Sequence, residues 1–165
     1  MIRNLFARSR PAGDPQAAKR VLIASEGRRF TTEVIDLAVR MVRAEGGHVR
    51  VLTVARLWGT SFGLPNPGLR PSRREMAEQE DNVSWAIGQL EDAGVSADGH
   101  IVTTRHPSKS ILNEAKRQKC DAIIMGADPR RHWIVRSMMW SQEPYRVSGR
   151  TPIPVHLVCP SSGQH

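Results

Sequence analysis

Short apolar segments alternate along this chain with stretches whose apolar residues recur at helical spacing, and this alternation restricts the possible folds more than any other feature. The apolar segments lie at residues 21–25, 48–55, 100–104, 122–125 and 153–158. Such short runs are typical of strands that are buried on both faces of a parallel sheet. Strands that alternate with helices usually form one sheet with helices packed on both of its faces. The sequence therefore predicts an α/β fold built on five parallel strands.

Helix start signals fall between these segments. Ser72 and Glu75 fit the capping box, in which the serine accepts from an early amide and the glutamate reaches back to the serine amide. Thr31 or Thr32 can cap an earlier helix, and Pro107 suits the first position of a later one. We therefore expect helices to begin at these three places.

The chain between the fourth and fifth strands predicts one further helix in two pieces, because Pro144 fits only a first helical turn. Ser141 is a candidate N-cap of the second piece. Prolines also stand at positions 152, 154 and 160, around the last strand. Proline cannot donate to a sheet ladder, so we expect residues 153–158 to form an edge strand.

Residues 56–72 contain three prolines and three glycines, and we expect a loop there instead of a helix or strand. Loops of this length in compact domains are often functional. Trp58 and Phe62 lie within it. Two interpretations stay open: these aromatic side chains form a lid over a cleft at the carboxyl ends of the strands, or they only pin the loop.

Much of the positive charge is concentrated at the N-terminus. Residues 1–20 supply +4 of the net charge of +8, with Asp14 as their one acidic residue. The remaining chain is only mildly basic, so we do not expect nucleic-acid binding. We expect residues 1–18 to be a flexible basic tail, residues 19–160 one domain, and residues 161–165 a C-terminal tail. An alternative role for the first 20 residues is docking on an anionic partner.

The remaining composition excludes several classes. No apolar run approaches the ~20 residues that span a membrane, and the N-terminus has no secretory signal, so we expect a cytoplasmic protein. Cys120 and Cys159 lack metal-site spacing, and we interpret both as small apolar side chains. No catalytic constellation stands out, and the segment Ser25-Glu26-Gly27 is not a nucleophile elbow. We therefore do not expect an enzyme.

Four segments in this order resemble the universal stress protein family: VLIASEG, HPSKSILNEAKRQKCD, DAIIMGA and PIPVHLV. The resemblance covers about residues 19–159. It implies an adenine nucleotide α-hydrolase-like (Rossmann-like) fold, with strand order 3-2-1-4-5. It also implies a homodimer formed through the C-terminal edge strand, Ile153 to Val158.

The ATP-binding members of that family carry the pattern Gly-x2-Gly-x9-Gly-Ser/Thr after the fourth strand. Gly126 matches its first glycine, but Pro129 stands at the second and Met139 at the third. Shifting the pattern by one residue gives Trp140 followed by Ser141. Proline has no amide to offer a phosphate, and a bulky side chain blocks the close approach of the backbone.

The resemblance also places a candidate nucleotide cleft at the carboxyl ends of the strands. Glu26 stands where the family usually has aspartate, and Arg130 and Arg131 are candidate side-chain ligands for phosphate. The alternative is that these arginines are solvated loop charges. The full candidate set is Ser25, Glu26, Val54, Gly126, Arg130, Arg131 and Ser141.

We therefore predict a binding or regulatory module in a stress response, with unidentified protein partners. We expect it to hold no metal and no cofactor, and not to bind ATP in the family manner. The alternative is a nucleotide-binding protein that holds ATP or AMP through arginine side chains, with slow hydrolysis of ATP as an additional activity.

Overall fold

The computed structural model describes residues 17–56, 60–61, 64–65, 71–127 and 143–159. Seven strands occur in this part of the chain: β1 (Arg20–Ser25), β2 (His48–Arg56), β3 (Thr60–Ser61), β4 (Leu64–Pro65), β5 (Ser96–Thr104), β6 (Ala122–Gly126) and β7 (Val155–Val158). The helices described are α1 (Thr32–Arg43), α2 (Arg73–Asp92), α3 (Pro107–Arg117) and α5 (Glu143–Ser148).

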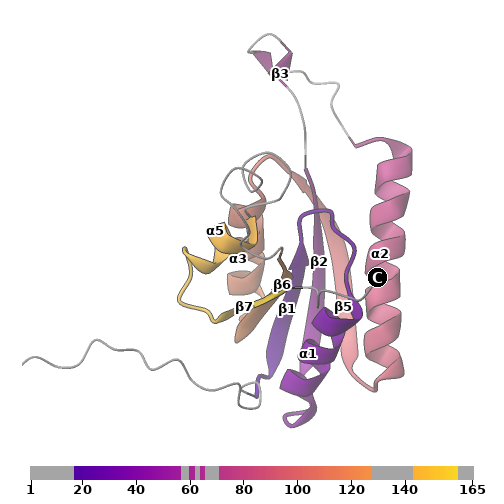
Figure 1. The fold of residues 1–165 in the computed structure, drawn as a ribbon, viewed down its shortest axis with the longest axis vertical. Coiled ribbons are helices and arrows are strands. Elements are labelled where there is room, and N and C mark those ends of the chain that lie inside the picture. The colour runs from indigo at the N-terminus through magenta and orange to yellow at the C-terminus, as the bar shows by residue number, and fades with distance from the viewer. Residues whose placement is uncertain (1–16, 57–59, 62–63, 66–70, 128–142, 160–165) are drawn as a thin grey trace, which may run out of the picture.

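The main sheet contains five strands in the order β5-β2-β1-β6-β7, and every neighbouring pair is parallel. Numbered along the chain, these strands have the order 3-2-1-4-5, which confirms the predicted topology. Helices α1 and α2 cover one face of the sheet, and α3 and α5 cover the other (Figure 1). The fold is therefore a three-layer α/β sandwich.

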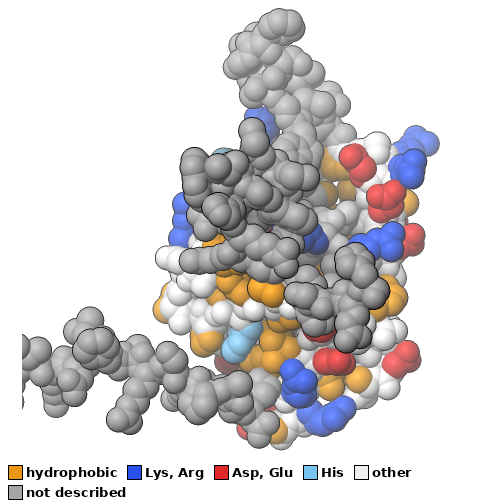
Figure 2. Space-filling model, viewed as in Figure 1, with side chains coloured by type: hydrophobic (Ala, Val, Ile, Leu, Met, Phe, Trp, Pro, Cys, Tyr) orange, Lys and Arg blue, Asp and Glu red, His pale blue; other side chains and the backbone are white. Residues whose placement is uncertain are grey.

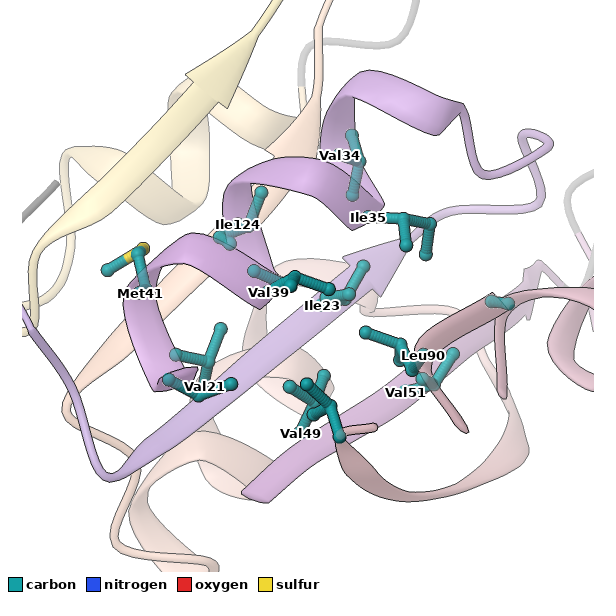
Figure 3. Packing of buried hydrophobic residues seen from close by; sticks show 14 of the residues in the cluster. Val21, Ile23, Val34, Ile35, Val39, Met41, Val49, Val51, Leu90 and Ile124 are labelled. Carbon is teal, nitrogen blue, oxygen red and sulfur yellow. The ribbon is translucent and has the colours of Figure 1, made fainter. Parts of the chain in front are cut away.

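The strand β1 lies at the centre of the sheet and is buried on both faces after its first residue. Its side chains alternate between two separate cores, because successive strand residues point to opposite faces. Val21 and Ile23 pack under α1 and α2, whereas Leu22 and Ala24 pack under α3 and α5. Figure 3 shows the first of these cores, in which side chains of α1 and α2 meet those of the central strands.

The predicted helix starts are largely confirmed. Both hydrogen bonds of the capping box form at α2: the Glu75 amide donates to Ser72 Oγ at 3.1 Å, and the Ser72 amide donates to Glu75 Oε2 at 2.6 Å. Thr31 occupies the N-cap of α1, but its side chain makes no capping hydrogen bond there. Pro107 is the first residue of α3, and Pro144 lies in the first turn of α5.

The strand boundaries differ from the prediction at both edges of the sheet. The strand β5 begins at Ser96, four residues before the expected start, because its register with β2 continues from Thr104 back to the pair His48–Ser96. Its first four residues, SADG, carry no apolar pattern that would identify a strand. The strand β7 begins at Val155 instead of residue 153 and pairs with β6 alone among the described strands, which agrees with an edge position.

The segment 56–72 was expected to contain no helix or strand, yet it carries a small antiparallel pair, in which Thr60 lies opposite Pro65 and Ser61 opposite Leu64. Trp58 and Phe62, the proposed lid residues, lie outside the described residues, as does the candidate N-cap Ser141.

On the face of the molecule that Figure 2 shows, both acidic and basic side chains are visible among the described residues, which agrees with the mild net charge of the domain. Cys120 is buried, and burial raises its thiol pKa to about 11, as befits an inert apolar side chain. Cys159 is exposed, so the expectation of two packed cysteines holds only for Cys120. No helix of the described part of the chain is long and apolar enough to cross a membrane.

Candidate functional site

The strand order reverses between β1 and β6, and ligands of open α/β sheets bind outside the carboxyl ends of the strands at such a point. Ser25 is the last residue of β1 and Gly126 the last of β6, and they leave the sheet side by side. Val54 follows the β2 residue that pairs with Ser25. The fold therefore brings these three predicted residues to one edge of the sheet.

Ser25 and Glu26 are both turned toward the loop that follows them. The buried Ser25 hydroxyl donates to the Arg28 carbonyl at 2.6 Å. The side chain of Glu26 is only 4% exposed, and its Oε1 lies 2.9 Å from Arg28 Nε. This ion pair lacks hydrogen-bond geometry, and Oε1 has no hydrogen-bond partner. The carboxylate is thus held inside the protein.

A small pocket lies between the ends of β1 and β6. Its volume is about 10 Å³, which is the space of a single water molecule at most. The residues that line it are Ala24, Ser25, Arg28, Arg29, Phe30, Val34 and Gly126. This pocket by itself is therefore too small to hold a nucleotide.

Two side chains of α2 fix that lining loop. Asn82 is buried, accepts from the Phe30 amide at 2.9 Å and donates to the Arg28 carbonyl at 2.8 Å. Gln79 donates to the Gly27 carbonyl at 3.3 Å and accepts from the buried Thr53 hydroxyl at 2.8 Å. The loop after β1 is therefore bound to the helix beside it through polar contacts.

Sequence reasoning missed four of these residues. Arg28 and Arg29 line the pocket, and the signal for them was available, since a basic pair begins three residues after the predicted strand ends at Ser25. Gln79 and Asn82 carried no such signal, because polar residues in a helix are usually solvent-exposed and only the packing of α2 places them against the loop.

Gly126 remains accessible. A Cβ atom built at Gly126 would meet no atom within 4 Å, so the backbone there has open space beside it. The other candidate ligands, Arg130, Arg131 and Ser141, lie outside the described residues, together with Pro129, Met139 and Trp140. Among the residues that the structure does describe, no group of histidine, cysteine, aspartate and glutamate side chains could hold a metal ion.

Comparison with known proteins agrees with this architecture. The model of the universal stress protein family matches residues 17–158. A search of curated protein sequences found no match.

Several solved structures share the fold. A universal stress protein from Archaeoglobus fulgidus aligns with a TM-score of 0.64 and 16% identity, over 86% of this chain and 93% of that chain. One from Archaeoglobus fulgidus solved in complex with dAMP aligns with a TM-score of 0.61 and 17% identity, over 88% and 98%. A family member from Arabidopsis thaliana with AMP bound aligns with a TM-score of 0.56 and 14% identity, over 90% and 94%. At these identities the likeness establishes the fold alone.

Proposed function

Because this chain belongs to the universal stress protein family, we propose that it acts as a binding or regulatory module in a stress response and does not bind ATP in the manner of the family's ATP-binding members. The observation that carries this proposal is the position of Glu26. A carboxylate that accepts a hydrogen bond from a ribose hydroxyl has to face the cleft. The carboxylate of Glu26 is instead buried against Arg28 Nε.

Turning Glu26 outward would be costly. It would separate the carboxylate from Arg28, whose side chain is 29% exposed, and the loss of this half-buried ion pair is unfavourable unless Glu26 finds a replacement partner. The loop itself resists movement, because Asn82 and Gln79 hold its backbone at Gly27, Arg28 and Phe30. These contacts support a loop position in which Glu26 stays turned away from the cleft.

The sequence after β6 points the same way. A phosphate loop presents consecutive backbone amides to the anion, and glycine permits both the close approach and the positive φ. Pro129 removes one amide, and Met139 or Trp140 adds a bulky side chain where the ATP-binding pattern has glycine.

Binding measurements test this proposal directly. We expect protein purified without added nucleotide to show the 260/280 nm absorbance ratio of protein alone, and calorimetric titration with ATP or AMP to give no binding heat. A binding constant for ATP in the micromolar range would overturn the proposal. A thermal-shift series with the same nucleotides serves as an independent readout, since a ligand that binds the folded state raises the Tm.

A second candidate function is nucleotide binding through arginine side chains. It is favoured by Arg28 and Arg29 in the pocket lining, by the open backbone at Gly126, and by the relatives solved with dAMP and AMP. If this second function is correct, the protein binds AMP, and either Arg130→Ala or Ser141→Ala lowers its affinity for AMP. Arg40→Ala is the matched control, because Arg40 is an exposed residue in the last turn of α1 and does not line the pocket. Equal affinity in all three variants would exclude recognition through Arg130 and Ser141.

We further propose a cytoplasmic homodimer without catalytic activity, joined through the edge strand at residues 153–158. All four residues of β7 are half-buried, and the strand has a neighbour on only one side within the described sheet. An edge strand of this kind is normally covered or paired. Light scattering should give twice the chain mass of 18.4 kDa, and a monomer would refute the dimer.

Phosphate release from ATP would refute the absence of catalysis.

A further inference from the structure

A cluster of charged and titratable side chains lies between α3 and the neighbouring strands β2 and β5, on the sheet face opposite α1 and α2. We call it the Arg50 cluster. It consists of His48 and Arg50 from β2, Ser96, Asp98 and His100 from β5, and Glu114 and Arg117 from α3. The strand members share one face because they occupy alternate positions in register, with Arg50 opposite Asp98.

Arg50 is the centre of this cluster, and each nitrogen of its guanidinium has a different partner. Its Nε donates to Glu114 Oε1 at 3.0 Å, its Nη1 donates to Asp98 Oδ2 at 2.6 Å, and its Nη2 lies 2.6 Å from His100 Nδ1. Glu114 is buried, and it also accepts from Arg117 and from Gln118 Nε2. Arg50 thus connects α3 to both strands at once.

The contact between Arg50 and His100 defines the protonation state of the histidine. Arginine is a donor at every nitrogen and stays charged, so His100 Nδ1 has to accept. His100 is therefore neutral, with its proton on Nε2. A proton added to Nδ1 removes the acceptor and places a second positive charge next to the guanidinium.

We propose that the Arg50 cluster is an acid-sensitive clamp, which holds the C-terminal half of α3 on β2 and β5 and weakens when His100 takes up a proton. The charges that face His100 are Arg50 from β2, Asp98 from its own strand, and Glu114 and Arg117 from α3. Glu114 Oε1 lies 4.0 Å from His100 Nδ1. A protonated His100 therefore competes with Arg50 for the Glu114 carboxylate. This competition weakens the ion pair between Arg50 and Glu114, which joins α3 to the sheet.

The direction of the pH effect follows from the surroundings of His100. Burial, together with the charge of Arg50, lowers the pKa of His100 below its ordinary value of 6.5. The opened form, in which His100 has its ordinary pKa, binds the proton more readily than the closed form. Opening therefore becomes more favourable as the pH falls below about 6.5. The carboxyls of Asp98 and Glu114 have lowered pKa values and stay ionised through this range.

Amide hydrogen exchange of the full chain, followed residue by residue by NMR between pH 7.5 and 5.0, tests the clamp. The reporters are the amides of Gln118 and Cys120, which donate to the Glu114 and Ala115 carbonyls at the end of α3. We expect their protection factors to fall by up to about tenfold per pH unit below about 6.5. The Ala93 amide, bonded to the Gln89 carbonyl at the end of α2, is the internal reference and should not follow.

Two variants separate the clamp from a general effect of acid. His100→Gln keeps an acceptor for Arg50 but cannot take up a proton, so protection at Gln118 and Cys120 should lose its pH dependence. His156→Gln is the matched control, because His156 is also a half-buried strand histidine with a lowered pKa, on the opposite edge strand β7. This variant should keep the pH dependence of protection at Gln118 and Cys120. A pH-independent α3 in the unmodified chain, or a persistent pH dependence in His100→Gln, overturns the proposal.

A direct measurement covers the case in which His100→Gln does not fold. Nitrogen-15 NMR of the unmodified chain should find the His100 ring proton on Nε2 at pH 7.5 and a titration midpoint below that of a histidine in the urea-unfolded chain. A ring proton on Nδ1, or a midpoint at or above the unfolded value, refutes the clamp.

Discussion

Gly99 in the middle of β5 offers a stringent test of the packing between β5, β2 and α2. A Cβ atom added there would lie 2.6 Å from the Val51 carbonyl oxygen and 3.0 Å from Val83 Cγ1. Ordinary contacts begin at 3.4 Å, so the Val51 carbonyl would have to retreat by about 0.8 Å. That carbonyl belongs to a buried inner strand, which cannot shift without disturbing the sheet.

We expect Gly99→Ala to destabilise the protein by about 1–2 kcal/mol. Overpacking typically costs about 1–3 kcal/mol, and the lower backbone entropy of alanine in the unfolded chain offsets roughly 0.5–1 kcal/mol of it. Urea unfolding followed by far-UV circular dichroism should show a midpoint lowered by about 0.5–1 M with an unchanged slope.

Gly88→Ala is the matched control for this substitution. Gly88 lies in α2, and a Cβ atom there meets no atom within 4 Å. The same chemical change should therefore raise stability by about 0.5–1 kcal/mol, because alanine is the better helix former. The packing argument would be refuted if Gly99→Ala were as stable as the unmodified chain, or if both variants shifted in the same direction.

Three further predictions concern hydrogen bonds and charge. Asn82→Ala should cost about 1–3 kcal/mol in urea unfolding, because it leaves buried backbone groups of the β1–α1 loop without partners; a loss below about 0.5 kcal/mol would contradict this. Ser72→Ala should cost about 1 kcal/mol through the lost cap of α2, and an unchanged urea midpoint would count against it. Burial alone would raise the pKa values of Asp98 and Glu114, but the hydrogen bonds from His48 to Asp98 and from Arg50 to Glu114 hold the first below 3.8 and the second below 4.5. The stability that these ionised carboxyls contribute at neutral pH should therefore be lost as the pH falls through their lowered pKa values. Urea midpoints between pH 6 and 2 should fall less steeply in Asp98→Asn/Glu114→Gln, and parallel curves would refute the assignment.

The sequence predicted the fold where local pattern and burial agree. The segments that became β1 and β6 are almost entirely apolar because both of their faces are covered, and this property is visible in the sequence alone. The start of β5 was missed for the opposite reason. Ser96 and Asp98 are exposed residues of an edge strand, and their strand conformation comes from pairing with β2.

The candidate site was predicted less completely. The positions of Ser25 and Gly126 at the carboxyl edge of the sheet followed from the sequence, because strand ends can be read from the apolar pattern, and their role as ligands stays a prediction. The orientation of Glu26 could not be read in this way, since it depends on Arg28 in a loop that is held by Asn82 from another element.

The sequence by itself determined the alternation of strands and helices, the central position of the most apolar segments and the departures from the ATP-binding pattern after Gly126. Those features depend on the types of neighbouring residues along the chain. Only the tertiary structure decided that Glu26 is closed off by Arg28, and that Arg50 joins β2, β5 and α3 in one cluster. Arg50 is separated in sequence from Asp98 by 48 residues and from Glu114 by 64. These side chains therefore meet only through the packing of the folded chain, and no local pattern in the sequence indicates their hydrogen bonds.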